Sequence, residues 1–86
     1  KIDSGVHIAH NVKIGEHSRI GAHSVLLGHC EIGDFVDIWT NVVIKEGIKI
    51  GNNAVIGSCS FVDVDVPDNS HFISEHKKII HDFKKK

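Results

Sequence analysis

Long apolar runs, a strong net charge and a large set of cysteines are all missing from this chain of 86 residues. No apolar stretch approaches the ~20 residues that a membrane-spanning helix needs, which argues against a membrane span. The net charge of −1 gives no electrostatic reason to expect nucleic acid as a partner. The chain also lacks an initiator methionine and a signal peptide. We therefore expect a processed or truncated chain, and whether an upstream domain is missing stays open.

An aliphatic residue recurs at every sixth position of the sequence. The series runs without a gap through Ile2, Ile8, Ile14, Ile20, Leu26, Ile32, Ile38, Ile44, Ile50, Ile56 and Val62. Internal periodicity of this kind outranks other sequence signals, because it predicts one structural unit repeated along the chain.

Two further series accompany the aliphatic one. A small or β-branched residue stands four positions after each aliphatic residue, from Val6 to Val66, and with the next aliphatic residue gives the in-out-in alternation of a short strand. The position before each small residue is predicted to be a corner: Gly5, Asn11, His17, His23, His29, Phe35, Asn41, Gly47, Asn53, Cys59 and Asp65. Most of these residue types tolerate positive φ. Strand and corner should therefore alternate every six residues.

The two cysteines occupy different positions of the repeat. Cys30 is predicted to point inward and Cys59 to lie at a corner, so a disulfide framework is not expected. Unpaired cysteines fit a reducing compartment, and we expect a cytoplasmic protein.

Three repeats have the full order aliphatic-Gly-x-x-small-x, namely residues 14–19, 20–25 and 50–55. In these the chain resembles the hexapeptide-repeat acyltransferases, whose fold is a left-handed parallel β-helix with three hexapeptides in each triangular coil. The resemblance implies an all-β domain over residues 1–67 with about three and two-thirds coils, in which residues one coil apart stack at the spacing of adjacent strands.

The end of the chain departs from the repeat. Pro67 is expected to end strand pairing, because proline cannot donate a ladder hydrogen bond. Residues 68–86 are predicted to be an extension with a short amphipathic helix, in which Ser74 is the N-cap and Ile79, Ile80 and Phe83 form the apolar face.

Histidine is abundant, with 8 residues, and their positions differ in meaning. His17, His23 and His29 fall at predicted corners, where tolerance of positive φ explains them. His10 lies one residue before a corner and points outward. Stacking by one coil places His10, Asn11, Gly28 and His29 in one cluster.

The residues of this cluster resemble one branch of the family. Segment 7–11 reads His-Ile-Ala-His-Asn and segment 27–29 reads Leu-Gly-His, similar to the UDP-N-acetylglucosamine O-acyltransferases and the related glucosamine N-acyltransferases. The resemblance implies that His10 is the general base, with Asn11 beside it in the catalytic cluster. It also implies that the Gly28 N–H holds the oxyanion, while His7 and His29 contact the substrate.

The acyl donor stays open between acetyl-coenzyme A and acyl carrier protein. Residues 28–38 also resemble acetyltransferases that act on sialic acids and UDP-amino sugars. Asp37, however, stands where those enzymes usually carry a histidine, and a C-terminal signature that contacts coenzyme A is replaced by other residues. The acceptor is expected to be a hydroxyl or an amine of a nucleotide-linked sugar.

Two readings from other classes remain. Carbonic anhydrases of the same fold bind zinc through three histidines across a subunit boundary, and His10, His23 and His29 could imitate that set. The spacing of His23 and His29 is one residue too long for it, so no metal is predicted. The chain could also be a non-catalytic assembly module.

An apolar stripe on the outer surface predicts a subunit interface. His7, Val25, Val43 and Phe61 should stack in one column, and Leu27 adds apolar area beside it. The resemblance implies a homotrimer, and both ends of so short a coil stack need covering. Trp39 should point outward, partly buried by a neighbouring subunit or the C-terminal helix.

Overall fold

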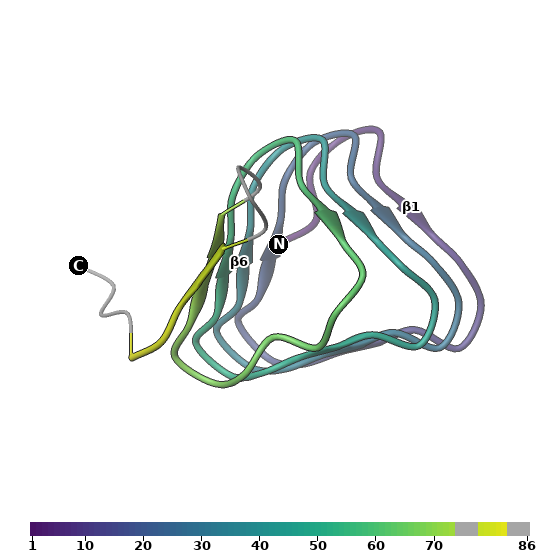
Figure 1. The fold of residues 1–86 in the computed structure, drawn as a ribbon. Coiled ribbons are helices and arrows are strands. Elements are labelled where there is room, and N and C mark those ends of the chain that lie inside the picture. Colours follow the sequence, from purple (N-terminus) through teal and green to yellow (C-terminus); the bar gives the residue numbers. More distant parts are fainter. Residues whose placement is uncertain (74–77, 83–86) are drawn as a thin grey trace.

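The computed structural model describes residues 1–73 and 78–82, and every regular element in this part of the chain is a β-strand. Figure 1 looks along the coil axis and shows a triangular prism, around which the chain turns clockwise as it approaches the viewer. That sense of rotation is left-handed. The structure is therefore a left-handed parallel β-helix, as the repeat predicts.

Three sheets form the faces of the prism, and the first ten strands lie on successive faces in turn. Face 1 holds β1 (His7–Ile8), β4 (Val25–Leu26), β7 (Val43–Ile44) and β10 (Phe61–Val62). Face 2 holds β2 (Lys13–Ile14), β5 (Glu31–Ile32) and β8 (Lys49–Ile50). Face 3 holds β3 (Arg19–Ile20), β6 (Asp37–Ile38), β9 (Val55–Ile56), β11 (His71–Ile73) and β12 (Lys78–Ile80). We call the turns after faces 1, 2 and 3 the first, second and third corners.

Equivalent residues of successive coils pair directly along the axis. On face 1, His7 pairs with Val25, Val25 with Val43, and Val43 with Phe61. Each step is 18 residues, as in the hydrogen bond between Glu16 and Asp34. The predicted stacking is confirmed, and it brings residues of three different coils to the same corner.

Left-handed backbone marks the corners, as expected. All ten predicted corner residues from Gly5 to Cys59 have positive φ, including His29 at 65° and the unusual Phe35 at 58°. The prediction is wrong at Asp65, and Asn69 has positive φ instead. The short polar or ring-bearing residues at these corners therefore have a structural reason to be there.

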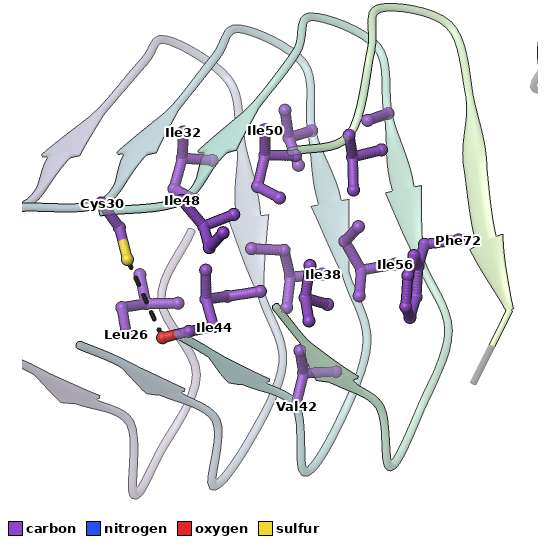
Figure 2. Packing of buried hydrophobic residues seen from close by; sticks show 14 of the residues in the cluster. Leu26, Cys30, Ile32, Ile38, Val42, Ile44, Ile48, Ile50, Ile56 and Phe72 are labelled. Atoms are coloured by element: carbon purple, nitrogen blue, oxygen red, sulfur yellow. Dashed lines mark hydrogen bonds between the residues drawn. The ribbon is translucent and has the colours of Figure 1, made fainter. Parts of the chain in front are cut away.

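The aliphatic series fills the interior of the prism. Figure 2 shows side chains of all three faces converging there, among them Leu26, Ile32, Ile38, Ile44, Ile50 and Ile56. Fully burying such a side chain contributes about 1.5–3 kcal/mol, so these residues are the main source of stability. Ser18 and Ser24, which are also buried, donate to the carbonyls of Gly33 and Trp39 at 2.7 and 3.0 Å. The small positions thus satisfy the backbone at the edge of the core.

The last coil is two residues shorter than the others. Val66 bridges to Ile50, and His71 pairs with Val55, so the step along the axis falls to 16 residues. Val66 was predicted to belong to the small series. It is 2% exposed and pairs with Ile50, so it takes an aliphatic position instead. Pairing also resumes after Pro67, because β11 joins face 3. The β-helix therefore extends beyond the predicted boundary at residue 67.

The predicted C-terminal helix is wrong for the described residues. Residues 78–80 form β12, which pairs antiparallel with β11 through His71 and Ile80, and Ile79 packs against the core. The predicted N-cap at Ser74 and the last residues of that helix, 83–86, lie outside the described part. Among the described residues, no helix has the length and apolar character needed to cross a membrane.

Candidate active site

The first corner carries the histidine predicted to act as a base. The chain leaves β1, passes Ala9 and His10, and turns at Asn11, whose φ is 60°. His10 is exposed at this turn. One coil further on, the N–H of His29 donates to the carbonyl oxygen of His10 at 3.2 Å. The backbone hydrogen bond fixes the two coils relative to each other at this corner.

The imidazole of His10 lies over Gly28. A Cβ built on Gly28 would stand 3.6 Å from Cε1 and 3.7 Å from Nε2 of His10. Gly28 itself is buried. The ring therefore covers the backbone of Gly28, where no side chain intervenes.

The backbone conformation alone does not require glycine at position 28. Its φ lies outside the left-handed region, and an added Cβ would meet its neighbours only at ordinary van der Waals distance. Gly33, in the next repeat, differs: a Cβ there would lie 2.4 Å from Oδ1 of Asn52. The fold explains Gly33 but not Gly28, so the missing side chain at position 28 points to a role in binding or chemistry.

The N–H of Gly28 forms no hydrogen bond with an acceptor among the described residues, although Gly28 is buried. At the second corner, the equivalent N–H groups of Glu16 and Asp34 donate to side-chain oxygens of Asp34 and Asn52, each at 2.8 Å. At the first corner, the residue equivalent to these acceptors is Glu46, one coil beyond Gly28, and no hydrogen bond joins its carboxylate to the Gly28 N–H.

His29 contacts His10 side on. The ring centroids are 5.3 Å apart and the planes meet at 86°, an edge-to-face arrangement. Such a contact restricts the rotation of an exposed imidazole. His29 is itself exposed. Its positive φ explains why it lies at the corner, and its ring faces the imidazole of His10.

The other two predicted site residues lie at different distances from this centre. Asn11 follows His10 in the same turn and stacks one coil from His29. His7 begins β1, and at about 3.3 Å per residue it stands roughly 10 Å along the strand from His10. The structure thus groups His10, Gly28, His29 and Asn11, while His7 lies on face 1 at the edge of the site.

Sequence reasoning missed Glu46. It occupies the first corner one coil beyond Gly28, and the N–H of the adjoining Gly47 donates to the carbonyl oxygen of Gly28 at 3.0 Å. His10, Gly28 and Glu46 therefore follow one another along the axis. The step of one coil that identified Gly28 would also have identified this carboxylate.

The stripe predicted as an interface is present on face 1. Val25 and Val43 are half-buried, and Phe61 is 46% exposed. Leu27, also half-buried, continues the stripe toward Gly28. Apolar surface thus adjoins the corner that carries the catalytic candidates.

The zinc alternative requires histidines of two subunits to meet. His23 lies at the third corner, so it does not converge with His10 and His29 within one chain. Among the described residues, no group of three His, Cys, Asp or Glu side chains could hold a metal ion.

The fold and this corner define a class of protein, a left-handed β-helix built from six-residue repeats in which the imidazole of His10 lies next to Gly28. The sequence profile of the bacterial transferase hexapeptide family (six repeats) matches residues 1–28 and 29–63. The chain belongs to this family, which confirms the resemblance drawn from the repeats.

Two curated relatives match over 62 residues, or 72% of the chain. The acyl-[acyl-carrier-protein]–UDP-N-acetylglucosamine O-acyltransferase of Nautilia profundicola is 39% identical, and that of Helicobacter pylori is 37% identical. The matched segments make up 24% and 23% of these relatives, so the chain spans about a quarter of their length.

A solved structure also aligns with the chain. It is a mutant of the GDP-perosamine N-acetyl transferase from Caulobacter crescentus in complex with CoA and GDP-perosamine. The sequences are 16% identical, the alignment covers 99% of this chain and 53% of the other, and the TM-score is 0.37.

Proposed function

We propose that this chain is the catalytic β-helix of an acyltransferase that moves an acyl group from a thioester to a hydroxyl or amine of a nucleotide-linked sugar, with His10 as general base. The observation that carries the proposal is the His10 imidazole lying against Gly28, whose lack of a side chain the fold does not explain. Family membership and the acyltransferase names of the matched relatives support the reaction class.

The geometry supplies two functions that acyl transfer needs. His10 takes the proton from the attacking O–H or N–H while that atom bonds to the thioester carbonyl carbon. The carbonyl oxygen becomes an oxyanion, which accepts a hydrogen bond from the Gly28 N–H. The tetrahedral intermediate then collapses, the C–S bond breaks, and the imidazolium of His10 returns its proton to the thiolate.

The size of each contribution can be stated in advance. A positioned general base typically supplies ~10²–10⁴-fold in rate, and one oxyanion donor ~10²–10³-fold. His29 would hold the base through its edge-to-face contact at 5.3 Å. Asn11 in the same turn is proposed to belong to the catalytic group, while His7 on face 1 and His29 are proposed to contact the acceptor sugar.

The acyl donor is proposed to be acyl carrier protein or acetyl-coenzyme A. The matched relatives are named for acyl carrier protein and UDP-N-acetylglucosamine, which favours that donor and a UDP-sugar acceptor for the first assay. A cytoplasmic location forms part of the proposal, because Cys30 and Cys59 are both free thiols.

We further propose a homotrimer assembled through the stripe of Val25, Leu27, Val43 and Phe61 on face 1. This stripe is exposed apolar surface beside the first corner, and such surface commonly marks a protein contact. A partner subunit there would close one side of the site around His10 and exclude water.

A turnover assay tests the function. The full-length protein is mixed with UDP-N-acetylglucosamine, or with a UDP-amino sugar, and either acyl carrier protein loaded with an acyl group or acetyl-coenzyme A, and the released thiol is measured. Release that requires both substrates supports the proposal. A correctly folded protein that turns over none of these combinations would instead be an assembly module.

A further inference from the structure

A hollow lies on face 3, away from the first corner. It encloses 460 Å³ and lies over Gly21, with the indole of Trp39 on the next coil and Asp3 on the preceding one. Hydrogen bonds fix these three levels, since the N–H of Asp3 donates to Ile20 and that of Gly21 donates to Ile38, at 2.9 and 2.7 Å. The backbone of Gly21 therefore lies between Trp39 and the carboxylate of Asp3 in the hollow.

Close stacking of the coils requires glycine at position 21. A Cβ at this position would lie 2.5 Å from the backbone carbonyl of Trp39. The absence of a side chain is thus imposed by the neighbouring coil, and Gly21 lines the hollow with backbone alone.

Trp39 is held at one side and open at the other. The His71 ring meets the indole edge to face, with centroids 5.5 Å apart and planes at 63°. The indole remains 47% exposed and borders the hollow. The partial burial predicted for Trp39 is therefore supplied by β11, while one aromatic surface still faces solvent.

The remaining walls carry both donors and acceptors. Arg19 uses Nε and Nη2 on the carboxylate of Asp37, at 2.8 and 3.2 Å, and a guanidinium has five N–H donors, so donors remain. The hydroxyls of Thr40 and Ser58 lie 3.4 Å apart at the opposite end. Asp3 adds an exposed carboxylate.

We propose that this hollow binds the pyranose ring of a saccharide. A pyranose has one face of C–H groups, which packs on an indole, and a rim of hydroxyls that both donate and accept hydrogen bonds. Nucleosides are the competing ligands in the test, because a nucleobase also stacks on an indole and forms hydrogen bonds at its edges. The site is separate from His10, which lies at the first corner, and it does not depend on the proposed acyl transfer.

The only tryptophan of the chain is the one that lines the hollow, so intrinsic fluorescence reports directly on it. N-acetylglucosamine and galactose are titrated separately into the full-length protein, with uridine and adenosine as nucleoside probes. We expect a saturable change in emission with at least one sugar, at a dissociation constant on the order of 1 mM for an open site of this size. The nucleosides should cause none.

Variants test the contribution of each wall. Saturation-transfer NMR with the same sugars should show binding weakened at least ~10-fold by Trp39→Ala and several-fold by Arg19→Ala, but unchanged by Lys49→Glu on face 2. Circular dichroism checks that each variant is folded. A response to nucleosides alone, or to none of the probes, would overturn the proposal. So would a Trp39 emission that acrylamide cannot quench, because the indole would then be buried between subunits.

Discussion

The imidazole of His10 lies on the bare backbone of Gly28, with Cε1 3.6 Å from the point where a Cβ would be. The two residues come from successive coils and meet because one coil separates them along the axis. The repeat itself thereby positions the proposed base next to the proposed backbone donor.

Replacing Gly28 with alanine should separate activity from stability. The added methyl group has room at ordinary contact distance and the backbone has no positive φ, so we expect the melting temperature to change little. The same methyl group would occupy the space between the His10 ring and the Gly28 N–H, and kcat/KM should fall ~10²-fold or more. Thermal unfolding and steady-state turnover measure the two effects.

Gly33→Ala is the matched comparison, because its Cβ would lie 2.4 Å from Asn52 Oδ1. This variant should lower the melting temperature clearly. A Gly28→Ala protein that unfolds as readily as Gly33→Ala would refute a functional role for Gly28.

Removal of the proposed base should affect turnover alone. His10→Ala is expected to lower kcat by ~10²-fold or more, because no other group takes the proton, while the oligomer stays intact. Turnover and sedimentation give the two readouts.

His17→Asn is the control for His10→Ala. His17 has φ of 60° at the second corner, and asparagine tolerates that conformation. Its turnover should match that of the unmodified protein. If His10→Ala is as active as this control, the general base is another group.

Interface and activity should be lost together on face 1. Val43 is half-buried between Val25 and Phe61, and Val43→Glu would bury an unpaired carboxylate in the proposed trimer contact. We expect dissociation in sedimentation velocity and loss of turnover, although His10 is unchanged. Lys49→Glu changes charge on exposed face 2 and should preserve both properties. A trimeric, active Val43→Glu protein would place the interface elsewhere.

The two thiols should differ sharply in reactivity. Cys30 is buried with its Sγ 3.0 Å from the carbonyl of Lys45, and burial raises the pKa of this thiol above its ordinary value. Cys59 is exposed at the third corner. Because the thiolate is the reactive form, a thiol reagent at pH 8 should modify Cys59 quickly and Cys30 only after unfolding. Mass spectrometry with and without denaturant would measure the labelling of each thiol. Rapid labelling of Cys30 in the native protein would contradict its burial in the core.

The repeat allowed most of the fold to be predicted. Six-residue spacing fixes which side chains point inward, and the residue types at the corners match the positive φ that the turns need. The interpretation failed after Val62, because the chain drops two residues before Val66 and a strict period cannot register a shortened turn. It failed again at residues 78–80, where Ile79 and Ile80 fit an amphipathic helix in spacing but pair with β11 instead.

The site was predictable to the extent that it depends on coil stacking. His10, Gly28 and His29 are neighbours because of the period, and the structure places them so. The edge-to-face orientation of the two imidazoles could not be predicted, because it depends on rotamers that the repeat does not specify. Glu46 was missed because the stacking argument stopped at Gly28 and was not extended by one more coil along the same corner.

The reversal at β12 has a consequence for how such a prism meets other molecules. A parallel solenoid exposes the hydrogen-bonding edge of its outermost coil, and an unprotected edge can recruit a strand from another chain. On face 3 the edge of β11 is occupied by β12, whose direction is opposite to that of every other strand on the face. β12 is three residues long and bears Lys78, and short strands with lysine are poor templates. Face 3 therefore ends in a strand that resists pairing with a strand from another chain.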